Sequence, residues 1–204
     1  MGCINSKGKI LPVEIILTSI DLDTQESRPV KEFPFYSQRL KAVDYQAIIA
    51  NGDNWTDPTF PPEKSSILDA TMMRQKRHEE WENFVWKRPE EVYGEDGFVV
   101  YNKIGPNDIK QGKCGDCYFL SSISSLAEKE NRVERIFVTK EVNKAGCYAV
   151  QLYLNGEMKI VVVDDYFPYD TFKEEWAMSK PSEDSNEIWV LIIEKAWAKV
   201  FGSY

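Results

Sequence analysis

Two cysteines three positions apart stand at the start of an apolar stretch, in the run QGKCGDCYFLSSISS over residues 111–125. The apolar positions after Cys117 follow helical spacing, so Cys117 is expected to begin a buried helix with Asp116 near its N-cap. A thiol at the positive end of a helix dipole is favoured as the thiolate, the nucleophilic form of cysteine. The pattern therefore predicts that Cys117 attacks carbonyl carbons.

Gln111 stands six residues before Cys117 and is followed by a glycine. A side-chain amide at this offset can fold back beside the thiol. It would then donate, together with the backbone N–H of Cys117, to the oxyanion that forms on attack. Gly112 and Gly115 are expected to let the intervening loop turn tightly. Gln111 is accordingly the predicted oxyanion donor.

Other uses of the cysteine pair fit the sequence less well. A redox pair of the thioredoxin type follows a buried apolar strand, whereas this pair follows the polar run GPNDIKQGK. A zinc site needs four ligands, and Cys3, Cys147 and His78 do not lie at ligand spacing from the pair. Packing as a small buried side chain is the alternative role for Cys147 and for Cys114.

The segments around the cysteine loop predict helices and one hairpin. Residues 147–154 alternate in the period of a strand, the pair Asn155-Gly156 is a strong turn signal, and residues 158–163 form the return strand. Three further segments are predicted as helices: residues 37–52 ended by Gly52, residues 68–86 stopped by Pro89, and residues 185–200 capped by Ser185 or Asn186.

Composition restricts the class of protein. The chain has 204 residues, of which 43% are hydrophobic, and this suits a globular domain rather than a disordered one. Its net charge of −8 argues against a nucleic-acid partner. No apolar run is long enough to span a bilayer, and four cysteines do not form a disulfide scaffold. A reducing, cytoplasmic setting is expected.

The cysteine loop resembles the active-site segment of the calpains, calcium-dependent cysteine endopeptidases with a papain-like core. Further segments resemble the same family in the same order: DPTFPP, FVWKRPEEV, NDIKQG, VVVDDYFP and NEIWVLIIEKAWAKVFGSY. The resemblance covers about residues 45–204. Lys113 and Cys114 stand where the family has small or apolar residues, and Tyr118 stands where it has tryptophan.

The resemblance implies an α+β fold, namely the helical, cysteine-bearing lobe of a papain-like core with a small antiparallel hairpin, truncated before the second lobe. Residues 1–35 are expected to form an N-terminal tail and connector. Residues 36–204 are expected to form the first subdomain of the protease core.

The function that the resemblance implies is calcium-dependent limited proteolysis of intracellular protein substrates. In papain-like enzymes the histidine and asparagine that complete the site lie more than about a hundred residues after the cysteine. The single histidine here, His78, lies before Cys117 among charged residues. We therefore expect the chain to be inactive alone and to need a second lobe from a longer product. The alternative is a non-catalytic, membrane-anchored regulator or scaffold of calpain type.

The resemblance also implies a Ca²⁺ site. Matched position by position, its ligands are the carboxylates of Asp108 and Asp184 and the backbone carbonyls of Tyr101 and Lys103, with Glu183 as an alternative to Asp184. Oxygen ligands of this kind suit Ca²⁺. Without the resemblance, Asp108 would be read as capping a turn and Asp184 as lying near a helix start.

The N-terminus MGCINS fits the pattern for myristoylation of Gly2, and Cys3 beside it is a candidate for palmitoylation. Two acyl chains give stable membrane attachment where one does not. The sequence therefore predicts a cytoplasmic protein that associates with membranes through its acylated terminus. An ordinary flexible terminus is the alternative.

Overall fold

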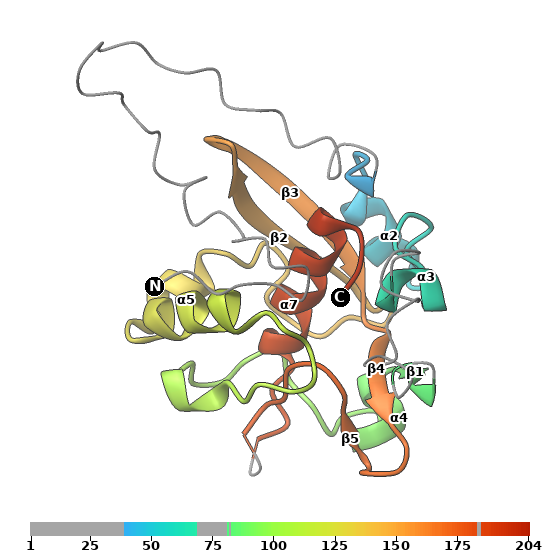
Figure 1. Cartoon of the computed structure of the whole chain (residues 1–204). Coiled ribbons are helices and arrows are strands. Elements are labelled where there is room, and N and C mark those ends of the chain that lie inside the picture. The colour runs from blue at the N-terminus through green and yellow to red at the C-terminus, as the bar shows by residue number, and fades with distance from the viewer. Residues whose placement is uncertain (1–38, 69–80, 82, 183–184) are drawn as a thin grey trace, which may run out of the picture.

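Residues 39–68, 81, 83–182 and 185–204 are described in a computed structural model (Figure 1). The architecture is α+β, as predicted, with helices packed around two small antiparallel sheets. The helices are α2 (Tyr45–Asn51), α3 (Lys64–Ile67), α4 (Pro89–Tyr93), η3 (Pro106–Asp108, 3-10), α5 (Cys117–Ala127), α6 (Glu130–Glu134) and α7 (Trp189–Phe201). The strands are β1 (Val85–Lys87), β2 (Cys147–Leu154), β3 (Glu157–Asp164), β4 (Phe167–Asp170) and β5 (Glu175–Trp176).

The predicted hairpin is confirmed as the antiparallel pair β2–β3, with Cys147 opposite Asp164 and Leu154 opposite Glu157. The residues of the turn, Asn155 and Gly156, have φ of 53° and 80°, the left-handed values that a two-residue hairpin turn needs. The expected alternation holds only near the turn. At the other end both faces of β2 are buried, because α2 packs against the hairpin.

Helix α7 lies at the centre of the lobe, against the hairpin on one side and α5 on the other (Figure 1). Eleven of the thirteen residues of α7 are buried. This burial explains why its sequence is apolar on nearly every face. Gly202 ends it at φ 103°. No helix of the described ranges is long and apolar enough to cross a bilayer.

The start of α7 differs from prediction. Neither Ser185 nor Asn186 caps the helix, which begins three residues later with Ile188 at the N-cap position. The reason is that Glu187 first forms a parallel bridge with Val99, so the chain is still extended there. Ser185 instead accepts a hydrogen bond from the Glu187 amide at 3.2 Å.

The helix predicted for residues 68–86 is wrong at its C-terminal end. Residues 85–87 form strand β1, in which Val85 pairs with Tyr169 of β4. Pro89 does not merely stop an element but occupies the first turn of α4, where its missing N–H costs nothing. Residues 69–80 and 82, which include His78, lie outside the described residues. The helix predicted from residue 37 begins at Tyr45 and ends at Gly52 as expected.

Buried ion pairs connect the central helix to the segments that carry the calpain-like motifs. Lys199 Nζ lies 2.6 Å from Asp57 Oδ2, and Lys195 pairs with Asp164. The same Asp164 accepts from the backbone N–H of Asp57 at 2.7 Å. All four side chains are at most 1% exposed. The network therefore joins DPTFPP, VVVDDYFP and the EKAWAK run of α7 in one place.

The buried thiol of Cys147 makes stability depend on pH in the alkaline range. Burial, aided by the negative charges of Asp57 and Asp164, raises its pKa to about 12. In the unfolded chain a cysteine has a pKa of about 8.5. Between these values only the unfolded state releases the proton. The stabilising contribution is therefore complete below pH ~8.5 and decreases as pH rises, by up to about 1.4 kcal/mol per pH unit.

Urea unfolding between pH 8 and 11 checks this expectation. The free energy of unfolding of the natural chain should fall more steeply with pH than that of Cys147→Ala, which lacks the titrating thiol. Parallel pH profiles for the two proteins would contradict the role of Cys147.

Candidate functional site

The loop that leads to Cys117 is held by backbone hydrogen bonds to the segment that precedes α7. The backbones of Lys110 and Lys180 exchange hydrogen bonds of 3.0 and 2.8 Å, and the Lys113 amide donates to the Ala177 carbonyl at 2.9 Å. The Lys113 ammonium also pairs with Asp170 at 3.0 Å. The lysine that departs from the family pattern thus anchors the loop to β4.

Gly112 is required by close approach rather than by a turn. A Cβ at this position would lie 1.4 Å from the carbonyl oxygen of Met178, so only glycine lets the two backbones run this close. At Gly115 a Cβ would meet nothing within 4 Å. Neither glycine has a positive φ. The chain bends at residues 113–115, and of the two glycines only Gly112 is constrained by a close approach.

The Gln111 side chain folds back over the loop to Cys114. Its Nε2 donates to the carbonyl of Cys114 at 3.0 Å, which leaves the second hydrogen of the amide for another acceptor. The side chain is exposed. Cys117 begins α5 as predicted and is partly exposed. Asp116 stands at the N-cap, but its carboxylate makes no capping hydrogen bond.

The helix behind Cys117 is fixed against α7. Phe119 and Trp197 stack with ring centroids 4.7 Å apart and planes 8° apart. The Trp197 indole N–H donates to the Tyr118 hydroxyl at 3.0 Å. The tyrosine that replaces the family's tryptophan therefore has a hydrogen-bonding partner on the central helix. The position of the thiol is set by α7 as well as by α5.

A second group of polar atoms surrounds the loop over residues 101–108, which carries the expected calcium ligands Tyr101, Lys103 and Asp108. Asp108 Oδ2 accepts from the Gly105 amide at 2.6 Å, so Asp108 caps a turn. Glu187 Oε1 accepts from the amides of Asn102 and Lys103 at 2.8 and 3.1 Å.

Glu187 is a carboxylate that the sequence analysis did not single out. It is 8% exposed, and its Oε2 has no hydrogen-bond partner among the residues that the structure describes. Because it belongs to the motif NEIW, position-by-position matching could have found it. The structure thus brings an under-satisfied carboxylate to the loop that carries Tyr101 and Lys103. Asp184 and its alternative Glu183 lie outside the described residues.

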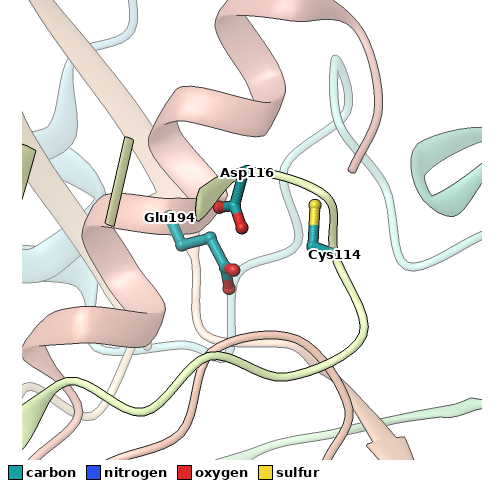
Figure 2. A group of neighbouring side chains, drawn as sticks. All are labelled: Cys114, Asp116 and Glu194. Atoms are coloured by element: carbon teal, nitrogen blue, oxygen red, sulfur yellow. The ribbon is translucent and has the colours of Figure 1, made fainter. Parts of the chain in front are cut away.

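Cys114, the other cysteine of the pair, is partly exposed and lies beside the acidic side chains of Asp116 and Glu194 (Figure 2). Its Sγ and one oxygen each of Asp116 and Glu194 lie within 4.8 Å of one another. Burial raises the pKa of the thiol well above its usual value, and the charges of Asp116 and Glu194 raise it further. These effects favour the protonated form of the Cys114 thiol, which is the less nucleophilic one. Gly2 and Cys3, the predicted acylation sites, lie outside the described residues.

Comparison with known proteins identifies the family. A family model described as calpain family cysteine protease matches residues 55–204. The chain is 34% identical over 215 residues to Calpain-type cysteine protease DEK1 of Zea mays, which covers 98% of the chain and 10% of that protein. It is 34% identical over 178 residues to the Arabidopsis thaliana protein of the same name (82% of the chain, 8% of that protein).

The chain is also 32% identical over 170 residues to Calpain-A of Drosophila melanogaster, which covers 79% of the chain and 19% of that protein. The chain thus spans a small part of the length of each of these relatives. Because the family match takes in the cysteine loop, the hairpin and the central helix, the chain belongs to the calpain family of cysteine proteases.

Proposed function

We propose that this lobe supplies the nucleophile of a calcium-dependent cysteine endopeptidase that cleaves protein substrates at few sites. The observation that supports the proposal most is the cysteine loop. Its Gln111 amide folds back at 3.0 Å from the Cys114 carbonyl while Cys117 begins α5. A nucleophile at a helix start and a nearby amide donor are the two parts that attack on a carbonyl needs.

In the proposed reaction the Cys117 thiolate attacks the scissile carbonyl carbon, a C–S bond forms, and the carbonyl electron pair moves onto oxygen. The second N–H of Gln111 Nε2 stabilises that oxyanion. Collapse of the intermediate then expels the amine, which must receive a proton from an imidazole. The single histidine of the 204 residues is His78, upstream of the thiol. We therefore propose that the chain by itself has little or no peptidase activity.

Alkylation kinetics test the nucleophile. With iodoacetamide at pH 7 in the presence of Ca²⁺, mass spectrometry of tryptic peptides should show Cys117 reacting at least about tenfold faster than Cys114, whose thiol is held protonated. Cys117→Ser identifies the peptide that carries the fast site. A Cys117 rate no higher than that of free cysteine, even with the second lobe of a calpain-type relative added, would overturn the proteolytic proposal.

A cleavage assay tests the second part of the proposal. The purified chain, incubated with a denatured protein and Ca²⁺ beside a Cys117→Ala control, is expected to give no cleavage that depends on Cys117. Robust cleavage that is lost in the control would show that the 204 residues suffice. The endopeptidase proposal would then stand and the proposed inactivity would fall.

The calcium dependence that we propose rests on the residues around the 101–108 loop. Asp108, the carbonyls of Tyr101 and Lys103, and the unpartnered oxygen of Glu187 are all oxygen donors, the set that Ca²⁺ prefers. Asp184 is the further carboxylate expected there. Because Glu187 precedes α7 and Asp108 precedes the cysteine loop, metal binding by these residues would be linked to the position of that loop.

Isothermal titration checks the calcium ligands. Asp108→Asn and Glu187→Gln each remove one negative charge while keeping the size of the side chain, so Ca²⁺ affinity should fall at least about tenfold in either variant. Glu157→Gln, which changes an exposed carboxylate on the hairpin, should bind as the natural chain does. Unchanged affinity in both Asp108→Asn and Glu187→Gln would exclude this site.

The competing proposal is a non-catalytic regulator of calpain type, attached to membranes through Gly2 and Cys3. The position of the only histidine supports it, while the retained Gln111 and Cys117 support the protease. Incorporation of a myristate analogue that is lost in Gly2→Ala would support membrane attachment under either proposal. The alkylation test separates the two, because a regulator has no need of an activated thiol.

A further inference from the structure

The cluster of Cys114, Asp116 and Glu194 joins three parts of the lobe beside the nucleophile. Cys114 lies on the cysteine loop, Asp116 at the start of α5 and Glu194 in the middle of α7 (Figure 2). One potential ligand atom from each lies within 4.8 Å of the other two. No local sequence pattern reveals this group, because Glu194 is 78 positions or more from its partners.

The cluster has three acidic groups and a carboxylate oxygen that is not satisfied. Asp116 is 7% exposed, and its Oδ1 makes no hydrogen bond within the described part of the chain. The neighbouring ammonium groups are directed elsewhere: Lys113 pairs with Asp170, and Lys195 pairs with Asp164. A buried carboxylate oxygen without a partner is costly, and a bound cation is one way to remove that cost.

Glu194 is oriented as a ligand by its own hydrogen bonds. The Ser179 amide donates to its two oxygens at 3.0 and 2.8 Å, and the Ser179 hydroxyl donates at 2.7 Å. Side chains that ligate metals are commonly held by such outer partners, which fix the direction of the ligating atom. Ser179 thus holds the Glu194 carboxylate in place within the cluster.

We propose that Cys114, Asp116 and Glu194 bind a thiophilic divalent cation of the Zn²⁺ class. A thiolate and carboxylate oxygens are established zinc ligands, and three protein ligands leave one position of a tetrahedron for water. Binding displaces the thiol proton to solvent, together with any proton held between the two carboxyl groups. A thiolate ligand disfavours Ca²⁺, so this site differs in chemistry from the oxygen-lined one near Asp108.

Because the proposed metal site lies beside Cys117, an ion bound there would affect the cysteine loop. Cys114 supplies the carbonyl that accepts from Gln111, and Asp116 directly precedes Cys117. A cation held by these residues and Glu194 would tie the loop to α7. Zinc would then stabilise the lobe and fix the loop in the conformation described above.

Metal titration of the full chain tests the proposal. Zn²⁺ is titrated against a chromophoric chelator, and Co²⁺ is used as a spectroscopic probe because a cobalt–thiolate bond gives a charge-transfer band. The natural chain should bind one equivalent and show the band. Cys114→Ser should lose the band and bind Zn²⁺ at least about a hundredfold more weakly, since changes to outer partners alone cost about 10–100-fold. Ser179→Ala, which removes only the hydroxyl that orients Glu194, should weaken binding by about 10–100-fold.

Cys117→Ser and Cys3→Ser serve as matched controls and should bind as the natural chain does. Circular dichroism establishes that each variant is folded. Absence of the charge-transfer band in the natural chain, or Zn²⁺ affinity in Cys114→Ser equal to that of the natural chain, would overturn the proposal. If Cys114→Ser failed to fold, the band in the natural chain and the effect of Ser179→Ala would still decide it.

Discussion

Replacing Lys199 with methionine is expected to lower the free energy of unfolding by about 3–5 kcal/mol, the cost of breaking a buried ion pair by removing one partner. The Lys199 ammonium is 1% exposed and lies 2.6 Å from Asp57 Oδ2 and 2.6 Å from the Val162 carbonyl. Methionine keeps the volume of the aliphatic part of the lysine side chain, but it cannot donate a hydrogen bond to Asp57 or to the Val162 carbonyl. The Asp57 carboxylate would then remain buried without its counter-charge.

Urea denaturation at pH 7 measures this loss. Lys159→Met is the matched control, because the same substitution there removes an ion pair with Glu157 at the exposed end of the hairpin, and its urea midpoint should not change measurably. The double variant Asp57→Asn/Lys199→Met should recover part of the lost stability, since it also removes the buried negative charge. A loss below about 1 kcal/mol in Lys199→Met, the size typical of exposed pairs, would contradict the structural role of the network.

Gly112→Ala is expected to be the most damaging small change in the cysteine loop. Its methyl group would lie 1.4 Å from the Met178 carbonyl oxygen, so the loop must move away from residues 177–178. Overpacking of this kind costs about 1–3 kcal/mol, and the value here should lie at the upper end because backbone atoms meet. The displacement would also break the bond from the Lys113 amide to the Ala177 carbonyl.

The readouts are the urea midpoint and the alkylation rate of Cys117, which should fall together in Gly112→Ala. Gly115→Ala provides the comparison, since its methyl group would meet nothing within 4 Å. That variant should retain both the stability and the thiol reactivity of the natural chain. Equal behaviour of the two variants would show that the close approach at Gly112 does not constrain the loop.

Local sequence patterns correctly predicted the helix after Cys117 and the hairpin. The helix after Cys117 is amphipathic, and the hairpin has an Asn-Gly turn, so period and turn chemistry were sufficient for both. The family resemblance gave the α+β class, which neither pattern could give alone. It also indicated residues whose roles in catalysis, calcium binding and acylation stay predictions.

The features that were missed depend on contacts between distant segments. Residues 85–87 are a strand only because β4 pairs with them, and the helical spacing of the preceding residues hides this. Glu187 delays the start of α7 through its bridge to Val99. The requirement for glycine at position 112 comes from the Met178 carbonyl, 66 positions away. No window of sequence around any of these residues contains its partner.

The pair between Asp57 and Lys199, 142 positions apart, has a consequence for synthesis on the ribosome. At typical elongation rates the ribosome needs roughly 7–30 s to proceed from one partner to the other. The hairpin ends at residue 164 and the central helix at residue 201, so for roughly 2–7 s of that interval the nascent hairpin has no central helix to cover its apolar face. Newly made chains of this lobe should therefore engage chaperones until the last helix emerges, and folding of the lobe should be completed only after that helix is released.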